Sequence, residues 1–394
     1  MNSVDTNLVE KNITKVYIFS FLRSLIFVGP IMVLFVQSRS LDFKDFMLLQ
    51  SLFAITTFLF EIPTGVLSDR LGRKKSIIFG SVFLFLGHIA FTYAHSFIAF
   101  LAGEMFFAIG LAALSGTVDA FVYDTLLELK QQEKHKLIIG KIYFIGFIAG
   151  AMGAIIGGFL AKVSLDFVFY ANIVTLIFVP IVALTFVEPN YTKQKSKGVF
   201  SEIAIASKKL FFNGSNLKWI ILFSSFVYAI SQSAFWLYQP YLKLCEVDLV
   251  YFGFIFASFQ LIAGFSSKIA HAIEAKLGIL NSLILIDVAV GASLILMGSF
   301  AYAFSFLFIY GQQFSRGVKG VIISDIINKN SQSHYRATML SLEGFASRVA
   351  ASISMIVVGY AKGIFGVETT LIILGSTVMI IGFTILLIVR KVGE

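Results

Sequence analysis

The stretch Gly65-Val66-Leu67-Ser68-Asp69-Arg70-Leu71-Gly72-Arg73-Lys74-Lys75 lies between two long apolar runs, at about 46–66 and 76–92. At ~1.5 Å per residue, each run is about long enough to cross a hydrocarbon core of ~30 Å as a helix. The stretch therefore reads as a short turn between two membrane helices. Its cluster of Arg and Lys predicts that the turn faces the cytoplasm. We expect Gly65 and Gly72 to permit a tight reversal of the chain there.

This spacing resembles the signature between the second and third helices of the major facilitator superfamily. The matching residues are Gly65, Leu67, Asp69, Arg70, Gly72, Arg73 and Lys74. The resemblance implies a secondary transporter with twelve helices in two six-helix halves, which expose a central site alternately to each side of the membrane. The alternative is a solvated basic loop of an unrelated membrane protein.

The composition independently indicates a protein with many membrane spans. Of 394 residues, 58% are hydrophobic and 13% are charged, and the mean hydropathy is +0.88. A soluble chain of this length could not bury so much apolar surface. The net charge of +9 is better explained by basic cytoplasmic loops than by nucleic-acid binding. The single cysteine, Cys245, excludes an intramolecular disulfide and a cysteine-rich metal cluster.

Twelve apolar runs predict an all-α integral membrane protein with twelve transmembrane helices. Helices are expected because these runs are too long for barrel strands and because unpaired backbone groups are costly in lipid. The runs lie at about 15–37, 46–67, 76–94, 97–126, 140–162, 167–187, 218–240, 249–270, 279–299, 302–327, 338–361 and 367–390.

A polar interval divides these runs six and six, so we predict two pseudo-symmetric bundles at 1–187 and 218–394, joined by a cytoplasmic linker at 188–217. Most of the 31 Lys and Arg residues then lie on the side of the N-terminus. Both termini are therefore expected in the cytoplasm, and the chain in a bacterial inner membrane. The first run reads as a retained helix, not a signal peptide, because no small-residue cleavage site follows it.

A faint internal repeat supports the division. The segment 61–65 aligns with 260–264, and 115–119 aligns with 315–319 at nearly the same spacing. The second alignment places Asp119 and Lys319 at equivalent positions of the two halves. The superfamily resemblance implies that these helices face each other across a central cavity. The two side chains could therefore pair or jointly bind a zwitterion.

Polar and charged residues within the runs are candidates for contacts with substrate or protons, because such groups face a bundle interior or a wet cavity. The candidates are Arg23, Glu104, Asp119, Tyr123, Gln232, Trp236, Gln312, Arg316, Lys319, Glu343 and Arg348. Burial favours the protonated form of a carboxyl and a nearby cation favours the ionised form. A balance between the two would let a site load and release protons, and we rank Asp119 before Glu104 for this role.

One helical face in the run 302–327 carries Gln312, Arg316 and Lys319, which recur at i, i+4 and i+7. Two cations on one face indicate contact with water, acids or an anionic substrate. An equally good interpretation is a static ion pair with Asp287 or Glu343. Both interpretations keep this face inside the bundle.

An aromatic and amide face is predicted in the run 218–240. Its members are Tyr228, Gln232, Trp236 and Gln239. Such a face could stack on an amphipathic solute and hydrogen-bond it. For Trp236, an anchoring role at the membrane interface is an equal alternative.

Small residues in the run 140–162 predict close helix packing at Gly153, Gly157 and Gly158. The segment 153–158 resembles a signature of the superfamily's antiporters. It departs from that signature at Ala149, where the signature has glycine, and at Ala154, where it has proline. The kink associated with that signature is therefore in doubt, and ordinary small-residue packing is the alternative.

A conformational latch is predicted at the opening stretch, with Gly65, Asp69, Arg70, Gly72 and Arg73 as its members. Asp69 ends one helix on the cytoplasmic side, where a later helix begins near residue 338. The resemblance implies that these two helices meet when the cytoplasmic side is closed. A carboxylate at a helix start is favourable, so Asp69 would stabilise the outward-open state.

The functional expectation is proton-coupled export, as an antiporter, of a small organic solute such as a drug, a siderophore or another polar or anionic metabolite. The alternatives are an importer with the same fold, or a sensor or lipid-handling membrane protein that does not transport. We infer no metal site, because the five His are scattered, and no ATP-driven pump, because a phosphate-binding glycine loop is missing. No cofactor, no enzymatic nucleophile–base set and no nucleic-acid partner are expected. The expected partners are a solute, the proton and the lipid bilayer, and we expect a monomer.

Overall fold

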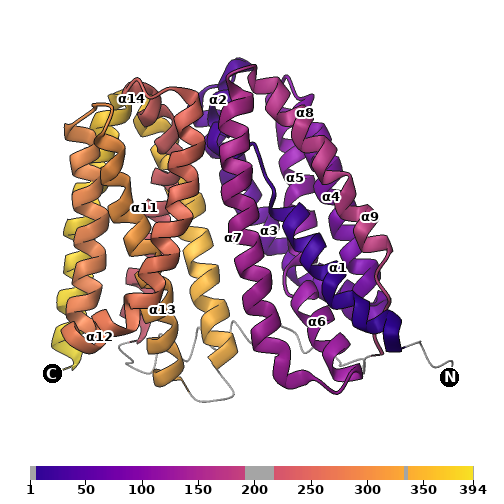
Figure 1. Ribbon diagram of the computed structural model, residues 1–394. Coiled ribbons are helices and arrows are strands. Elements are labelled where there is room, and N and C mark those ends of the chain that lie inside the picture. Colours follow the sequence, from indigo (N-terminus) through magenta and orange to yellow (C-terminus); the bar gives the residue numbers. More distant parts are fainter. Residues whose placement is uncertain (1–5, 191–216, 332–335, 394) are drawn as a thin grey trace. The chain divides into compact units, whose positions relative to one another are not determined.

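The computed structural model describes residues 6–190, 217–331 and 336–393, and within these ranges every regular element is a helix. The predicted all-α fold is therefore confirmed. The helices group into two compact units, which are coloured from indigo to yellow along the chain in Figure 1. Unit 1 comprises residues 1–41, 52–197 and 249–257. Unit 2 comprises residues 42–51, 198–248 and 258–394.

Unit 1 contains the helices of the first half of the chain, although the first residues of α3 belong to unit 2. These elements are α1 (Thr6–Ser24), η1 (Gly29–Ile31), α2 (Met32–Ser38), α3 (Phe43–Leu71), α4 (Arg73–Thr92), α5 (Phe97–Leu114), α6 (Thr117–Glu128), η2 (Gln132–Lys134), α7 (His135–Ala161), α8 (Leu165–Leu176) and α9 (Phe178–Leu184).

The first apolar run is broken between α1 and η1, and a buried amide satisfies the freed backbone groups. Asn172 of α8 accepts a hydrogen bond from Phe27 N (3.1 Å) and donates one to Leu25 O (3.2 Å). Unsatisfied backbone groups are costly in the hydrocarbon region, so such a break needs a polar partner inside the bundle. The fourth run is likewise divided, into α5 and α6, at Gly116, whose φ is +70°.

Unit 2 contains α11 (Leu217–Leu244), α12 (Leu249–Ser299), η3 (Ser305–Phe308), α13 (Ile309–Asn330) and α14 (Arg336–Gly393); the start of α12 belongs to unit 1. Two of these elements each hold two of the predicted runs. α12 is divided at Gly278 (φ +76°) and α14 at Gly366 (φ +77°). Glycine tolerates this left-handed conformation, which reverses the chain between the paired segments.

Nine helical stretches in the described ranges are long and apolar enough to cross a membrane. Two of the nine, in α12 and α14, each contain two of the predicted runs. The predicted run 302–327 is not among the nine. It corresponds to η3 and α13, and α13 carries three basic side chains and one acidic side chain. The helices are therefore consistent with twelve spans, and the chain is a multi-pass membrane protein.

The compact units do not follow the expected halves throughout. Residues 42–51 group with unit 2, and 249–257 with unit 1. Most of the expected linker, 191–216, lies outside the described residues. Its first residues, Glu188 to Asn190, belong to unit 1 and form hydrogen bonds with α4 and α6.

Candidate substrate-binding site

The signature turn is tighter than we expected from the sequence. α3 continues to Leu71, so Gly65 lies inside a helix, and the reversal takes place at Gly72 alone. Gly72 has φ +105°, and a Cβ there would lie 2.8 Å from Glu188 Oε1. The prediction that Gly65 takes part in the reversal is therefore wrong. Gly72 is required both by its backbone conformation and by the carboxylate beside it.

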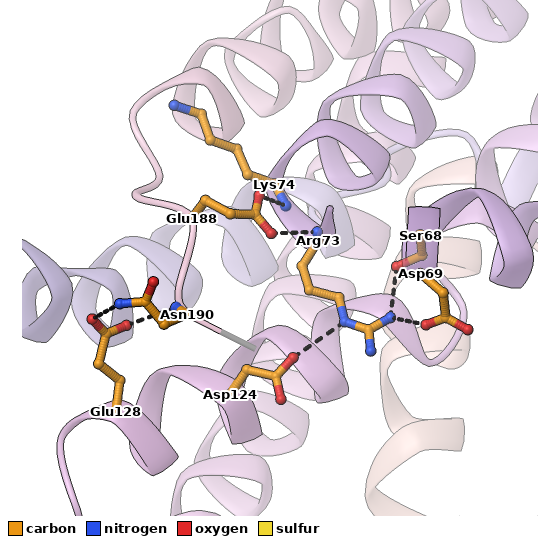
Figure 2. Close-up of polar contacts among 8 residues, drawn as sticks. All are labelled: Ser68, Asp69, Arg73, Lys74, Asp124, Glu128, Glu188 and Asn190. Carbon is orange, nitrogen blue, oxygen red and sulfur yellow. Dashed lines mark hydrogen bonds and ion pairs between the residues drawn. The ribbon is translucent and has the colours of Figure 1, made fainter. Parts of the chain in front are cut away.

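Glu188 caps the start of α4, as Figure 2 shows. Its carboxylate accepts hydrogen bonds from the backbone N atoms of Arg73 (2.6 Å) and Lys74 (2.8 Å). The first N–H groups of a helix have no partner within the helix, and the helix dipole favours an anion at this end. Glu188 therefore fixes the segment that follows α9 to the signature turn.

The Arg73 side chain joins three elements of unit 1 (Figure 2). Its guanidinium donates to Asp69 Oδ1 (2.8 Å) and Ser68 Oγ (2.9 Å) on α3, and to Asp124 Oδ2 (3.2 Å) on α6. Arg70 is exposed and forms no ion pair or hydrogen bond within the described ranges. Of the two arginines expected to hold the loop, Arg73 therefore makes the contacts. The contact of Asp69 with a later helix start stays a prediction.

A cavity of about 70 Å³ lies in unit 2 between α11 and α13. Pockets that hold a whole small molecule usually measure ~300–1,000 Å³. This cavity is therefore sized for one functional group of a solute. It is lined by Val227, Tyr228, Ser231, Gln232, Phe235, Tyr238, Gln312, Gln313, Ser315, Arg316 and Lys319.

The predicted polar face of α13 lines this cavity. Gln312, Arg316 and Lys319 all belong to the lining, as their helical spacing requires. From α11, the predicted Tyr228 and Gln232 take part as well. Gln232 forms no hydrogen bond with other described residues, so its amide is available to a ligand.

Two other predicted members of the α11 face lie outside the cavity lining. Trp236 packs edge-on against Phe46, with ring centroids 5.0 Å apart and an interplanar angle of 76°. Its Nε1 is buried without a hydrogen-bond partner in the described ranges. Gln239 is fully buried.

Arg316 has no acidic partner among the described residues. Its Nη2 atom donates to the neutral amide of Gln260 (2.8 Å), and its side chain is exposed. The guanidinium therefore keeps donors for a further acceptor. A guanidinium matches the planar oxygen pair of a carboxylate or phosphate.

Lys319 is held by polar and aromatic groups instead of a direct ion pair. Its Nζ atom donates to Ser224 O and Ser224 Oγ, both at 3.1 Å, and lies 5.2 Å from the centroid of the Tyr228 ring. Ser224 Oγ donates in turn to Glu343 Oε1 (2.6 Å), which also accepts from Ser347 Oγ (3.0 Å). Of the two proposed ion-pair acids, Glu343 is thus linked to Lys319 through a hydroxyl.

Tyr238 holds the two adjacent amides of the cavity lining, Gln312 and Gln313, in place. The Tyr238 hydroxyl donates to Gln312 Oε1 (2.9 Å) and accepts from Gln313 Nε2 (3.3 Å). Gln313 Oε1 is buried without a partner in the described part of the chain. The sequence analysis missed Gln313 and Tyr238. The adjacent Gln312-Gln313 pair was the one available signal.

The predicted site residues of unit 1 do not share this cavity. Asp119 lies on α6, with Oδ1 3.5 Å from His135 Nε2, and the Tyr123 ring stands edge-on to the His135 ring at 5.3 Å. Glu104 is 2% exposed on α5, and Arg23 lies 5.9 Å from the Phe19 ring. No sequence pattern singles out His135, because its partner Asp119 is on another helix.

Arg348 follows Glu343 by five residues on α14. It lies outside the cavity lining. Neither Arg348 nor Glu343 is therefore among the residues that line the cavity.

Three glycines of α7 pack directly against the backbone of other segments. A Cβ at Gly153 would lie 2.6 Å from Ile26 O, and a Cβ at Gly157 would overlap Phe27 O. A Cβ at Gly158 would lie 3.0 Å from Gly253 N, in the segment of α12 that belongs to unit 1. α7 is continuous from His135 to Ala161. These contacts leave no room for larger side chains.

Comparison with known proteins decides the family. The model of the Major Facilitator Superfamily matches residues 16–355. The chain belongs to the major facilitator superfamily. It is therefore a membrane transporter and not an enzyme, as we expected from the signature turn.

Relatives within the superfamily are distant in sequence. The chain is 22% identical over 396 residues to an uncharacterized MFS-type transporter, YxaM, of Bacillus subtilis, with 96% of each chain covered. It is 26% identical over 161 residues to the quinolone resistance protein NorA of Staphylococcus aureus, with 40% of each covered. Among solved structures it is similar to the nucleoside transporter NupG, with a TM-score of 0.80, 14% identity and 96% and 99% coverage. At this identity the structural likeness shows the fold alone.

Proposed function

We propose that this transporter exports a small organic solute with an anionic or zwitterionic group, in exchange for protons. The main observation in support of this proposal is the positive charge of the cavity in unit 2. Arg316 and Lys319 line it, and no Asp or Glu is among its described lining residues. A cationic solute would meet repulsion there, whereas an anionic group would be attracted.

The two cations have different surroundings, so we propose that they contribute differently to solute binding. Among the described residues, Arg316 hydrogen-bonds a neutral amide and no acid, so we take it as the primary anchor for an anionic group. Lys319 is already linked through Ser224 to Glu343 and adds a second, partly compensated charge. The aromatic rings of Tyr228 and Phe235 and the amide of Gln232 would contact the rest of the solute.

Proton coupling is assigned to Asp119 first and to Glu104 second. The side chain of Asp119 is 56% exposed and lies beside His135. A histidine beside a carboxylate is an arrangement that proteins use to pass protons from one group to another. Export as the direction is supported by the partial match to NorA, a protein named for quinolone resistance.

A thermal-shift series tests the substrate class. The purified chain is mixed with benzoate, with its neutral analogue benzamide and with the zwitterion phenylalanine. We expect benzoate or phenylalanine to raise Tm, benzamide to have less effect, and Arg316→Gln to abolish the difference. Lys329→Gln is the matched control, because Lys329 pairs with Asp325 and Glu274 away from the cavity. Equal shifts from all three compounds, or an unchanged response in Arg316→Gln, would contradict the anionic class.

Reconstituted vesicles test coupling and direction. The compound that shifts Tm is loaded into proteoliposomes containing a pH-sensitive dye, and its exchange against an imposed proton gradient is followed. Proton uptake that accompanies solute efflux supports an antiporter. Solute and proton movement in the same direction would instead establish the importer alternative.

A further inference from the structure

An unexplained carboxyl group lies within unit 2, in the second segment of α12. Asp287 is 2% exposed, and its Oδ1 atom has no hydrogen-bond partner in the described part of the chain. It follows Gly278, where this segment begins, by nine residues. At ~1.5 Å per residue, this places it well inside the hydrocarbon region. It is not among the residues that line the cavity between α11 and α13.

The Asp287 carboxyl packs directly against the backbone of α14 at Gly382. A Cβ at Gly382 would overlap Asp287 Oδ1 and lie 2.7 Å from its Cγ. The absence of a side chain at position 382 is what makes room for the carboxyl. On the α13 side, Ser315 Oγ donates a hydrogen bond to Ile286 O (3.4 Å). This hydroxyl therefore bonds the backbone next to Asp287 and not its carboxyl.

No described cation faces Asp287 from the elements packed against it. The three cations of α13 have other partners: Arg316 donates to Gln260, Lys319 donates to Ser224 and Lys329 pairs with Asp325. In the second segment of α14, the ionisable residues are Glu368, Arg390 and Lys391. The nearest of these in sequence, Arg390, follows Gly382 by eight residues, or ~12 Å along the helix.

An ionised carboxylate without a counter-ion is far more costly in such surroundings than its protonated form. We propose that Asp287 is a proton-binding site of unit 2, formed between α12 and the glycine surface of α14. In this packed arrangement, the Asp287 carboxyl is protonated. Release of the proton would leave a bare charge against Gly382. Deprotonation therefore requires water or a cation to reach this contact. The site is separate from Asp119 and does not depend on the direction of transport.

Infrared spectroscopy of the full chain tests the protonation directly. The protein is prepared with and without ¹³C in the aspartate side-chain carboxyl, and the two spectra are compared at neutral pH. We expect a carbonyl stretching band of a protonated aspartic acid that shifts with the label. The band should be lost in Asp287→Asn. Asp325→Asn should instead lose intensity from an ionised carboxylate, because Asp325 pairs with Lys329 at the exposed end of α13 and this hydrogen bond raises the pKa of Lys329.

Two outcomes would overturn the proposal. One is a labelled wild-type protein without a protonated-aspartate band at neutral pH, a measurement that requires no variant to fold. The other is a band that persists in Asp287→Asn. The proposed contact has its own test, because Gly382→Ala should lower Tm in the wild type and lower it less in an Asp287→Ala background. Gly344→Ala, at a position with nothing within 4 Å of a new Cβ, is the control. Equal effects of Gly382→Ala in both backgrounds would contradict the contact.

Discussion

Lys319 and Glu343 are joined through one hydroxyl group, that of Ser224. Lys319 Nζ lies 3.1 Å from Ser224 Oγ, which lies 2.6 Å from Glu343 Oε1. The cation and the carboxylate thus compensate each other without a direct ion pair. Lys319 lines the cavity, whereas Glu343 is not among its lining residues.

The first prediction concerns this bridge. Ser224→Ala removes the hydroxyl and leaves Lys319 bonded only to the backbone carbonyl of residue 224. Loss of a partner by a buried polar group costs about 1–3 kcal/mol, so we expect reduced Tm. Ser231→Ala, which changes a serine of the cavity lining outside the bridge, is the control. The bridge would be unimportant if both variants had the same Tm.

The second prediction separates binding from stability at Lys319. Lys319→Ala should weaken binding of benzoate while the protein still folds and inserts. If Lys319 only balances Glu343, the variant should instead lose stability, and adding Glu343→Gln should restore it. The double variant with Asp119→Asn tests the proposed pair across the halves. Strictly additive effects on binding would argue against that pair.

The third prediction concerns proton coupling. Asp119→Asn should abolish pH-driven accumulation of solute and leave exchange down the solute gradient intact, because only the proton site is lost. Glu104→Gln is the parallel test of the second candidate. His135→Gln should shift the pH dependence if the pair with Asp119 takes part. An unchanged pH profile in all three variants would remove these residues from the coupling mechanism.

The fourth prediction compares two glycines of the signature turn. Gly72→Ala forces a side chain into φ +105° and against Glu188, so we expect a loss of about 1–3 kcal/mol in unfolding free energy. Gly65→Ala lies in a helix with nothing within 4 Å of the new Cβ, so we expect a gain of up to about 1 kcal/mol. Thermal unfolding of both variants measures the difference. Equal losses would show that the turn does not depend on Gly72.

The fifth prediction concerns the latch. Asp69→Asn removes a charge worth about 0.3–1 kcal/mol at a helix start, and up to about 2 kcal/mol when partly buried. We expect a shift toward the inward-open state and slower turnover, with little change in intrinsic affinity. Spin labels near Leu71, at the end of α3, and near Arg336, at the start of α14, measure their separation. The Asp69–Arg73 contact is also lost, so Ser68→Ala, which removes another Arg73 contact, is the control. An unaltered distance distribution in Asp69→Asn would contradict the latch hypothesis.

The sequence by itself determined the class of protein, the family and one face of the cavity. Apolar runs of this length have few structural solutions in a bilayer, because every backbone group must be bonded internally. The seven matching residues of the turn indicated the superfamily, since they lie together in the chain. The face of Gln312, Arg316 and Lys319 followed from helical periodicity, which is a local property.

Only the tertiary structure decided which distant groups meet. Glu188 at the start of α4, Ser224 between Lys319 and Glu343, and His135 beside Asp119 each join residues from different elements. No local pattern encodes such pairings, because they depend on how the helices are packed and rotated against one another. The same holds for Asp287 and Gly382. In the sequence they are an acid and a glycine in separate apolar runs. Only the packing of α14 against α12 places the Asp287 carboxyl against Gly382.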